Sequence, residues 1–217
     1  MFNGPFEHSI IKRAIEQKLV EIAFVDLRKF GLGNHKLVDD KPYGGGKGMV
    51  LRVDILEKAI NKTKNKKLKM DEQKVILTSA HGKTFNQEIA GEYSKLKHLI
   101  IICGHYEGYD ERIKNFIDEE ISIGDFILTG GEIPAMLITD SVARLIKGVI
   151  KDESSLYESF SPLLEYPQYT KPQVFKKLEV PKILLSGNHE EIRKWRKEES
   201  IKVTKKLRPD LFKKAKD

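Results

Sequence analysis

Two glycine-rich segments in the middle of the chain carry the residues best suited to hold a ligand. They are residues 103–112 (CGHYEGYDER) and 122–134 (SIGDFILTGGEIP). Each follows a β-branched run, so its glycines fall where a buried strand ends and the backbone must turn or approach a bound molecule closely. Ligands of open α/β sheets bind at that edge. Backbone groups with scattered carboxylates and arginines suit a small adenosine-type ligand and a reaction that proceeds by positioning and proton transfer.

Other chemistries fail on residue type or spacing. The run 44–48 (GGGKG) is no P-loop, because that pattern needs glycine in place of Lys41 and Ser or Thr in place of Gly48. Neither glycine segment has the dinucleotide-binding spacing. The six histidines show no metal-ligand spacing, and no serine lies in a nucleophile elbow. Cys103, the only cysteine, follows an apolar run and is expected to be a buried apolar side chain instead of a nucleophile.

Composition sets the outer bounds. With 217 residues, 40% of them hydrophobic and 33% charged, the chain can bury one full core and carry a small appendage. No apolar run approaches the roughly 20 residues of a membrane span, and the first residues do not resemble a signal peptide. We therefore expect no membrane association and a cytoplasmic location. The net charge of +7 suggests a polyanionic partner, although lysine also serves solubility.

Strands and helices are expected to alternate over the first two thirds of the chain. Apolar periodicity predicts helices over residues 7–19, 53–60, 84–95 and 132–146, and strands over 21–27, 74–79, 98–103 and 121–128. Thr84 is expected to cap the third of these helices, and a short helix should begin at Asp110. The alternation predicts a mostly parallel sheet covered on both faces. A connector, residues 152–172, leads to a helical region in which Asn188 can cap a helix through Trp195.

Five longer runs together resemble the bacterial tRNA (guanine-N1)-methyltransferase (TrmD) family, in its order and roughly its spacing. They are residues 39–49 (DDKPYGGGKGM), 103–112, 122–134, 140–144 (DSVAR) and 184–189 (LLSGNH). The resemblance implies an α/β fold of the SPOUT type, whose mostly parallel sheet contains a deep trefoil knot, an exception to the rule that chains do not thread loops. It also implies a knotted methyltransferase domain over residues 1–150, a linker over 151–163 and a small C-terminal helical tRNA-binding domain over 164–217.

The same resemblance implies an activity and a cofactor. The family transfers a methyl group from S-adenosylmethionine to N1 of the guanosine 3′ of the anticodon, position 37 of tRNA, and works as a homodimer with its active site at the subunit interface. Taken alone, the glycines of the matching loops could be ordinary turn residues, but their clustering favours a site. The residues that match the cofactor-binding loops are Leu77, Thr78, Ser79, Gly104, Ile123, Gly124, Asp125, Phe126, Ile127, Leu128, Gly130, Gly131 and Pro134.

Two residues match the catalytic positions of the family. Arg144 matches its arginine, which would stabilise negative charge on guanine O6 as N1 loses its proton. Without the resemblance it would be interpreted as a surface cation. The general base of the family is an aspartate in a Glu-Asp-Ser-Phe type run, and residues 157–160 here are YESF. Glu158 is therefore assigned as the base, although its extra methylene shifts the carboxylate by about 1.5 Å.

The metal and tRNA assignments rest on fewer observations. Glu107 matches a glutamate linked to activity and Mg²⁺; its alternative is a surface carboxylate near a helix end. Magnesium uses few carboxylates and several waters, so no spacing tests this assignment. Cations recur around Trp195, and we assign Arg193, Arg196 and Lys197 to tRNA binding, against the alternative of a plain solvated helix. The lysine-rich run 61–69 is interpreted as a solvated loop.

Two other functions stay open at this point. A non-catalytic tRNA- or rRNA-binding protein that keeps the knot would explain glutamate at position 158, but it would not need Arg144 or the cofactor segments. A SPOUT methyltransferase acting on a different RNA is disfavoured by the run 186–189.

The resemblance also makes a prediction about the N-terminus. Family members begin with a hydrophobic strand and a Leu-Phe-Pro-Glu type turn, and Met1 aligns just after that turn. We therefore expect the first strand of the sheet to be missing, Met1 to be an internal methionine, and the natural protein to be longer by roughly ten residues, the length of one strand and its turn. Without that strand, its neighbours would lack a ladder partner on one side.

Overall fold

The computed structural model describes residues 2, 4–105, 107–150 and 158–214. The chain divides into two compact units, Met1–Ile150 and Lys151–Asp217. None of the described helices is long and apolar enough to cross a membrane.

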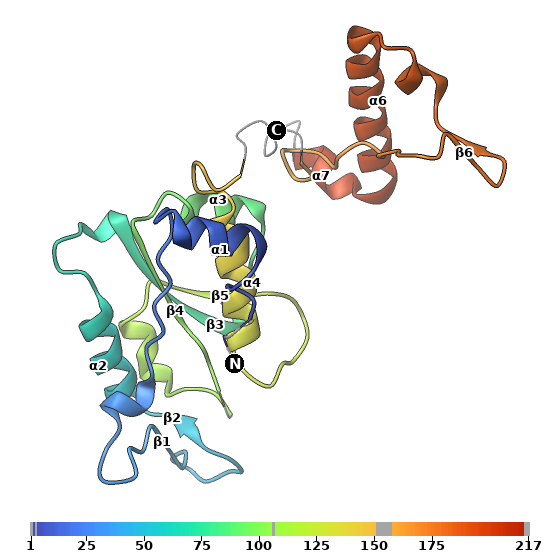
Figure 1. Cartoon of the computed structure of the whole chain (residues 1–217). Coiled ribbons are helices and arrows are strands. Elements are labelled where there is room, and N and C mark those ends of the chain that lie inside the picture. Colours follow the sequence, from blue (N-terminus) through green and yellow to red (C-terminus); the bar gives the residue numbers. More distant parts are fainter. Residues whose placement is uncertain (1, 3, 106, 151–157, 215–217) are drawn as a thin grey trace. The chain divides into compact units, whose positions relative to one another are not determined.

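A three-stranded parallel sheet forms the centre of the N-terminal unit (Figure 1). Strand β3 (Gln73–Thr84) lies between β4 (His98–Ile102) and β5 (Glu119–Ser122), with Val75 opposite Ile100 and Leu77 opposite Glu120. Val75, Ile76 and Leu77 are all fully buried, which is typical of a parallel strand covered on both faces. The sequence-based prediction of an α/β fold with a parallel sheet is confirmed.

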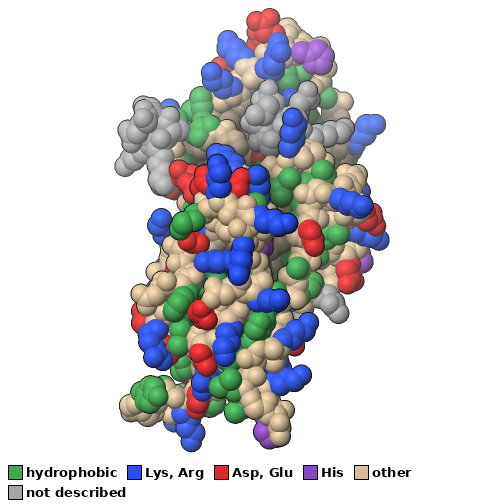
Figure 2. Space-filling model, turned by 90° about the vertical axis from the view of Figure 1, so that its left-hand side faces the viewer, with side chains coloured by type: hydrophobic (Ala, Val, Ile, Leu, Met, Phe, Trp, Pro, Cys, Tyr) green, Lys and Arg blue, Asp and Glu red, His purple; other side chains and the backbone are tan. Residues whose placement is uncertain are grey.

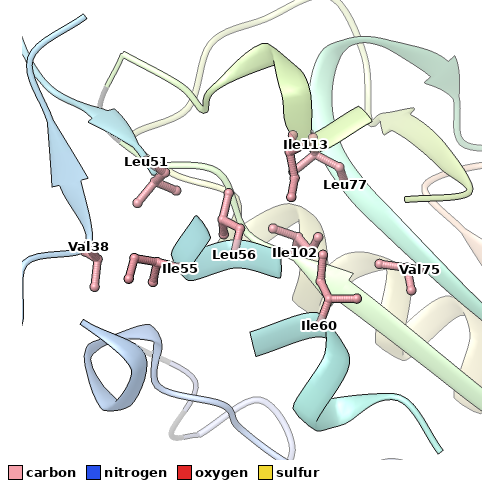
Figure 3. Close-up of a cluster of buried hydrophobic side chains, with 9 residues drawn as sticks. All are labelled: Val38, Leu51, Ile55, Leu56, Ile60, Val75, Leu77, Ile102 and Ile113. Carbon is pink, nitrogen blue, oxygen red and sulfur yellow. The ribbon is translucent and has the colours of Figure 1, made fainter. Parts of the chain in front are cut away.

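Each face of the sheet has its own core. On one face, α2 (Val53–Thr63) and the 3₁₀ helix η3 (Glu111–Asn115) pack on Val75 and Leu77. Figure 3 shows this cluster, which comprises Val38, Leu51, Ile55, Leu56, Ile60, Val75, Leu77, Ile102 and Ile113. On the other face, α3 (Gln87–Tyr93) and α4 (Glu132–Ala143) pack on Ile76. Full burial of one such aliphatic side chain contributes about 1.5–3 kcal/mol, so these two clusters hold β3, β4 and β5 between the helices.

The remaining elements of this unit are short. They are α1 (Ser9–Glu16), η1 (Leu27–Phe30), η2 (Met70–Glu72), and the strands β1 (Asp39–Asp40) and β2 (Val50–Leu51), which pair antiparallel. A third apolar cluster joins α1 to α4 through Ile11 and Ala143.

Three predicted boundaries were wrong for identifiable reasons. Residues 20–26 form no strand, because no ladder of the described chain gives their backbone groups a partner. The strand predicted over 121–128 ends at Ser122, because its partner β3 ends at the pair Thr84–Ser122. That pairing also takes Thr84 into the strand, and the side chain of Asn86 caps α3 in its place by accepting from the Ile89 N–H.

The C-terminal unit is a long helix with a short hairpin. Helix α6 (His189–Leu207) begins at Asn188, whose side chain accepts from the Glu190 and Glu191 N–H groups, so the predicted cap is confirmed. The other elements are the hairpin strands β6 (Val174–Phe175) and β7 (Leu178–Glu179), η4 (Lys182–Leu185) and α7 (Pro209–Lys214). Buried Thr204 anchors the preceding segment, because its Oγ1 accepts from the Leu164 N–H at 3.0 Å.

Candidate functional site

Three segments that are distant in sequence meet around Thr78, which lies within β3 just before its bulge. The Thr78 hydroxyl donates to the Ile102 carbonyl at 3.1 Å and accepts from the Gly104 N–H at 3.4 Å. The Gly104 carbonyl in turn accepts from the Gly131 N–H at 2.7 Å. The structure therefore brings together Thr78, Gly104 and Gly131 from all three segments predicted to bind the cofactor.

Only glycine fits at position 131, because the junction leaves no room for a side chain. A Cβ atom there would lie 2.3 Å from Thr78 Oγ1, 2.6 Å from Gly104 N and 2.7 Å from Cys103 Cα. Two of these atoms belong to backbone, which cannot rotate away. Pro134 follows in the first turn of α4 and is buried, where its missing N–H leaves no helical hydrogen bond unmade. With glycine at position 131, the backbone at the start of α4 packs directly against the backbone of Cys103 and Gly104.

The loop after β5 presents apolar side chains to solvent. Ser122 and Gly124 bond to each other at 3.2 Å through the serine hydroxyl, and Gly124 adopts φ +138°, which favours glycine. Beyond them Phe126 is 56% and Ile127 87% exposed, while Asp125 is exposed and Ile123 and Leu128 are half-buried. Large apolar side chains exposed together on a loop are typical of a binding surface.

A buried carboxylate oxygen next to Gly130 lacks a partner. Within the described chain, Oε2 of Glu132 makes no hydrogen bond and lies out of solvent, and Oε1 is 3.7 Å from His105 Nε2. An unsatisfied buried acceptor costs about 1–3 kcal/mol, so a ligand N–H or cation at this point would be stabilising. Glu132 was not predicted from the sequence, although its position directly after Gly130 and Gly131 could have indicated it.

A network of polar side chains holds Ser79 in place. The Tyr109 hydroxyl lies 2.7 Å from Glu120 Oε2 and 2.9 Å from Ser79 Oγ, and Lys114 Nζ lies 3.0 Å from Glu120 Oε1. Burial, reinforced by the bond to Glu120, raises the pKa of Tyr109 to about 12, so the phenol stays protonated at neutral pH. Ser79 sits in a bulge of β3, since Ile121 of β5 faces both Thr78 and Lys83. The network fixes this bulge at the edge of the candidate site.

Cys103 lies beside the same junction but is no nucleophile. Burial, and then the charge of Glu132, raise the pKa of its thiol to about 12. The thiolate is the reactive form, so the raised pKa disfavours a nucleophilic role, although the side chain is half-buried where the sequence predicted full burial.

Gly48, the last residue of the run 44–48, lies against Glu107. Gly48 has φ +80°, and a Cβ atom on it would lie 2.3 Å from Glu107 Cγ. The Glu107 N–H donates to the Met49 carbonyl at 3.1 Å. Across the described residues, no three His, Cys, Asp or Glu side chains are grouped so as to hold a metal ion. The assignment of Glu107 to Mg²⁺ thus gains no support from the structure.

The predicted catalytic residues lie in different units. Arg144 is the C-cap residue of α4, half-buried, and its N–H donates to the Asp140 carbonyl at 3.2 Å. Glu158 belongs to the C-terminal unit, where its carbonyl accepts from the Ser161 N–H at 3.3 Å. The segment that follows is tied to α6, because Ser200 Oγ donates to the Leu164 carbonyl at 2.6 Å.

The three cations predicted to bind tRNA are exposed along α6. Arg193, Arg196 and Lys197 fall in its first half. The Arg196 guanidinium lies 4.9 Å from the centre of the Tyr166 ring, and Trp195 packs against Tyr169. Aromatic packing thus orients this part of the helix and leaves its cations exposed.

Comparisons with known proteins agree over the whole length of the chain. The family model described as tRNA (Guanine-1)-methyltransferase TrmD matches residues 1–214. A tRNA (guanine-N(1)-)-methyltransferase from Dictyoglomus turgidum is 55% identical over 217 residues, 99% of this chain and 86% of that protein. Proteins of the same name from Clostridium tetani (54%, over 99% of this chain and 88% of that protein) and Endomicrobium trichonymphae (50%, over 99% and 95%) are similar to it as well. The chain therefore belongs to the tRNA (guanine-1)-methyltransferase family.

Proposed function

We propose that this protein methylates N1 of the guanosine 3′ of the anticodon, position 37 of tRNA, with S-adenosylmethionine as the methyl donor. Family membership supports the reaction class. The observation that carries the donor assignment is the junction of Thr78, Gly104 and Gly131, where the chain after β4 and the start of α4 meet β3 with no room for a side chain at Gly131.

The residues present fit S-adenosylmethionine. The exposed side chains of Phe126 and Ile127 offer apolar contact to an adenine ring, and Glu132 Oε2 offers a buried acceptor to a positively charged group. When bound, the donor supplies an electrophilic methyl carbon. We also propose that these segments form the trefoil knot that the sequence resemblance implies.

Arg144 and Glu158 share the proton chemistry in this proposal. Methylation at N1 requires loss of the N1 proton, and Glu158 is the carboxylate assigned to accept it. The resulting negative charge moves to O6, where the Arg144 guanidinium, permanently charged and planar, stabilises it. We further propose a cytoplasmic homodimer with its active site at the subunit interface. If Glu107 holds Mg²⁺, the other ligands come from water and RNA phosphates.

Charge distribution favours the C-terminal unit as the tRNA-binding part. Figure 2 shows Lys and Arg side chains interspersed with Asp and Glu over one face of the molecule. By sequence, residues 151–217 hold 16 Lys and Arg against 11 Asp and Glu, and so carry five of the seven net positive charges. A cationic surface of this kind binds a polyanion through phosphate contacts.

Neutralising Arg193, Arg196 and Lys197 together to glutamine is expected to weaken tRNA binding. The log–log salt dependence of the binding constant should fall by roughly one unit per lost phosphate contact, with donor affinity unchanged. Fluorescence anisotropy of labelled tRNA between low and moderate salt measures the slope. Glutamine at Lys62, Lys66 and Lys67, exposed lysines of the N-terminal unit, is the matched control. An unchanged slope in the α6 variant would make this helix a solvated surface.

Titration calorimetry with S-adenosylmethionine tests the donor assignment directly. One site per chain is expected, together with competition by the demethylated product. Absence of binding by folded protein would leave a non-catalytic RNA-binding protein as the better account.

A further inference from the structure

The β6–β7 hairpin projects from the C-terminal unit (Figure 1), and its large apolar side chains are exposed. Phe175 and Leu178 lie directly opposite each other in the ladder, so they share one face, yet they are 58% and 72% exposed. Every residue from 171 to 179 is exposed. A two-stranded hairpin without packing is marginally stable in water, so its own fold gains little from these apolar groups.

The turn of this hairpin carries lysine where the backbone disfavours it. Phe175 pairs with Leu178, which leaves a two-residue loop, and both of its residues, Lys176 and Lys177, have positive φ (+48° and +68°). Positive φ at both positions is the mark of a type I′ turn, for which Asn-Gly is the favoured pair. Side chains with a Cβ atom are disfavoured there, and such strain is retained at functional sites.

Charge and aromatic character point to a nucleic acid. Residues 171–182 contain Lys171, Lys176, Lys177 and Lys182 against a single carboxylate, Glu179. Lys176 Nζ lies 5.4 Å from the centre of the Phe175 ring. An ammonium group beside an exposed aromatic ring is the combination by which proteins hold unpaired nucleotides, since the ring stacks on a base and the cation contacts a phosphate.

We propose that the hairpin tip is an RNA-contacting element: Lys176 and Lys177 bind phosphates of the tRNA substrate, and the Phe175 ring contacts an exposed base. This inference rests on the proposed function and adds a second contact surface to the one on α6. It explains why two lysines occupy a turn that Asn-Gly would fit better.

The double variant Lys176→Asn/Lys177→Gly separates turn stability from RNA binding. Removing two phosphate contacts should lower the log–log salt slope of tRNA binding by about two units. The same change removes backbone strain from the turn and should stabilise the hairpin. The Val180 N–H donates to the Gln173 carbonyl at 3.0 Å across the hairpin, so its amide exchange should slow. Phe175→Ala should weaken binding roughly 10-fold at fixed salt without altering the slope.

Two variants serve as controls. Lys176→Arg/Lys177→Arg keeps both charges and should keep the parent slope. Lys66→Asn/Lys67→Asn removes two charges from an exposed loop of the N-terminal unit and should also keep it.

Several results would overturn the inference. Slower Val180 exchange with an unchanged salt slope in the Asn-Gly variant would show that the two lysines affect the hairpin but do not contact RNA. Loss of tRNA binding in the arginine variant would show that positive charge at the turn is not what binds the RNA. If the Lys176→Asn/Lys177→Gly variant had a smaller oligomer mass than the parent and the same tRNA affinity, the hairpin tip would instead contact a second copy of the chain. Failure of the parent chain to bind tRNA would instead count against the proposed function.

Discussion

Replacing Glu158 with glutamine is expected to lower the rate of methyl transfer by about 100-fold or more, the usual scale for a positioned general base. The amide keeps the shape of the side chain and its capacity to accept a hydrogen bond, but it cannot take the N1 proton. Single-turnover rates at saturating donor and tRNA measure this step without product release. Affinities for donor and tRNA should stay close to those of the parent.

Glu158→Asp is the matched control. The shorter carboxylate can still act as a base, so this variant should be active. A single-turnover rate for Glu158→Gln within a few-fold of the parent would show that another group accepts the proton.

Gly131→Ala is expected to impair both donor binding and stability. Its added Cβ atom would lie within 2.7 Å of Cys103 Cα and closer still to Thr78 Oγ1 and Gly104 N. Forcing a methyl group into such a contact costs about 1–3 kcal/mol of unfolding free energy. Because relief requires the backbone of the donor site to move, donor affinity should fall by roughly 10-fold or more. Denaturant unfolding and titration calorimetry measure the two effects.

Gly91→Ala is the control for this substitution. Gly91 lies in α3, and a Cβ atom there meets nothing within 4 Å. Alanine in that position should be neutral or raise the unfolding free energy by up to about 1 kcal/mol, from helix propensity alone. If Gly131→Ala behaved like Gly91→Ala, the close packing of three segments at Gly131 would not matter for the site.

The spacing of apolar residues along the chain predicted the layers of the fold, because buried strands and amphipathic helices repeat their apolar residues at different intervals. Val75 to Leu77 and the α2 stripe around Ile55 were predicted by these periods. Boundaries that depend on a partner strand could not be predicted this way. Thr84 and Asn86 can both cap a helix; asparagine is the better cap by type, and the ladder between Thr84 and Ser122 places Thr84 in the strand. Residues 20–26 have strand-like composition but no partner within the described chain.

The site was predictable where glycine marks it and unpredictable where tertiary contacts create it. Gly104 and Gly131 were predicted from the sequence, and the structure adds that Thr78 links them. The unpaired oxygen of Glu132 and the bond between Tyr109 and Glu120 depend on segments that meet only in the fold. The roles of Arg144 and Glu158 stay predictions from the family resemblance.

Identification of the methylated nucleoside tests the central proposal most directly. The protein is incubated with unmodified tRNA transcripts and S-adenosylmethionine labelled in its methyl group, and the RNA is then digested and its nucleosides separated. The proposal predicts label in 1-methylguanosine only, from transcripts with guanosine directly 3′ of the anticodon, and none when that base is replaced. Label in another nucleoside, at another position, or equally in both transcripts would contradict it.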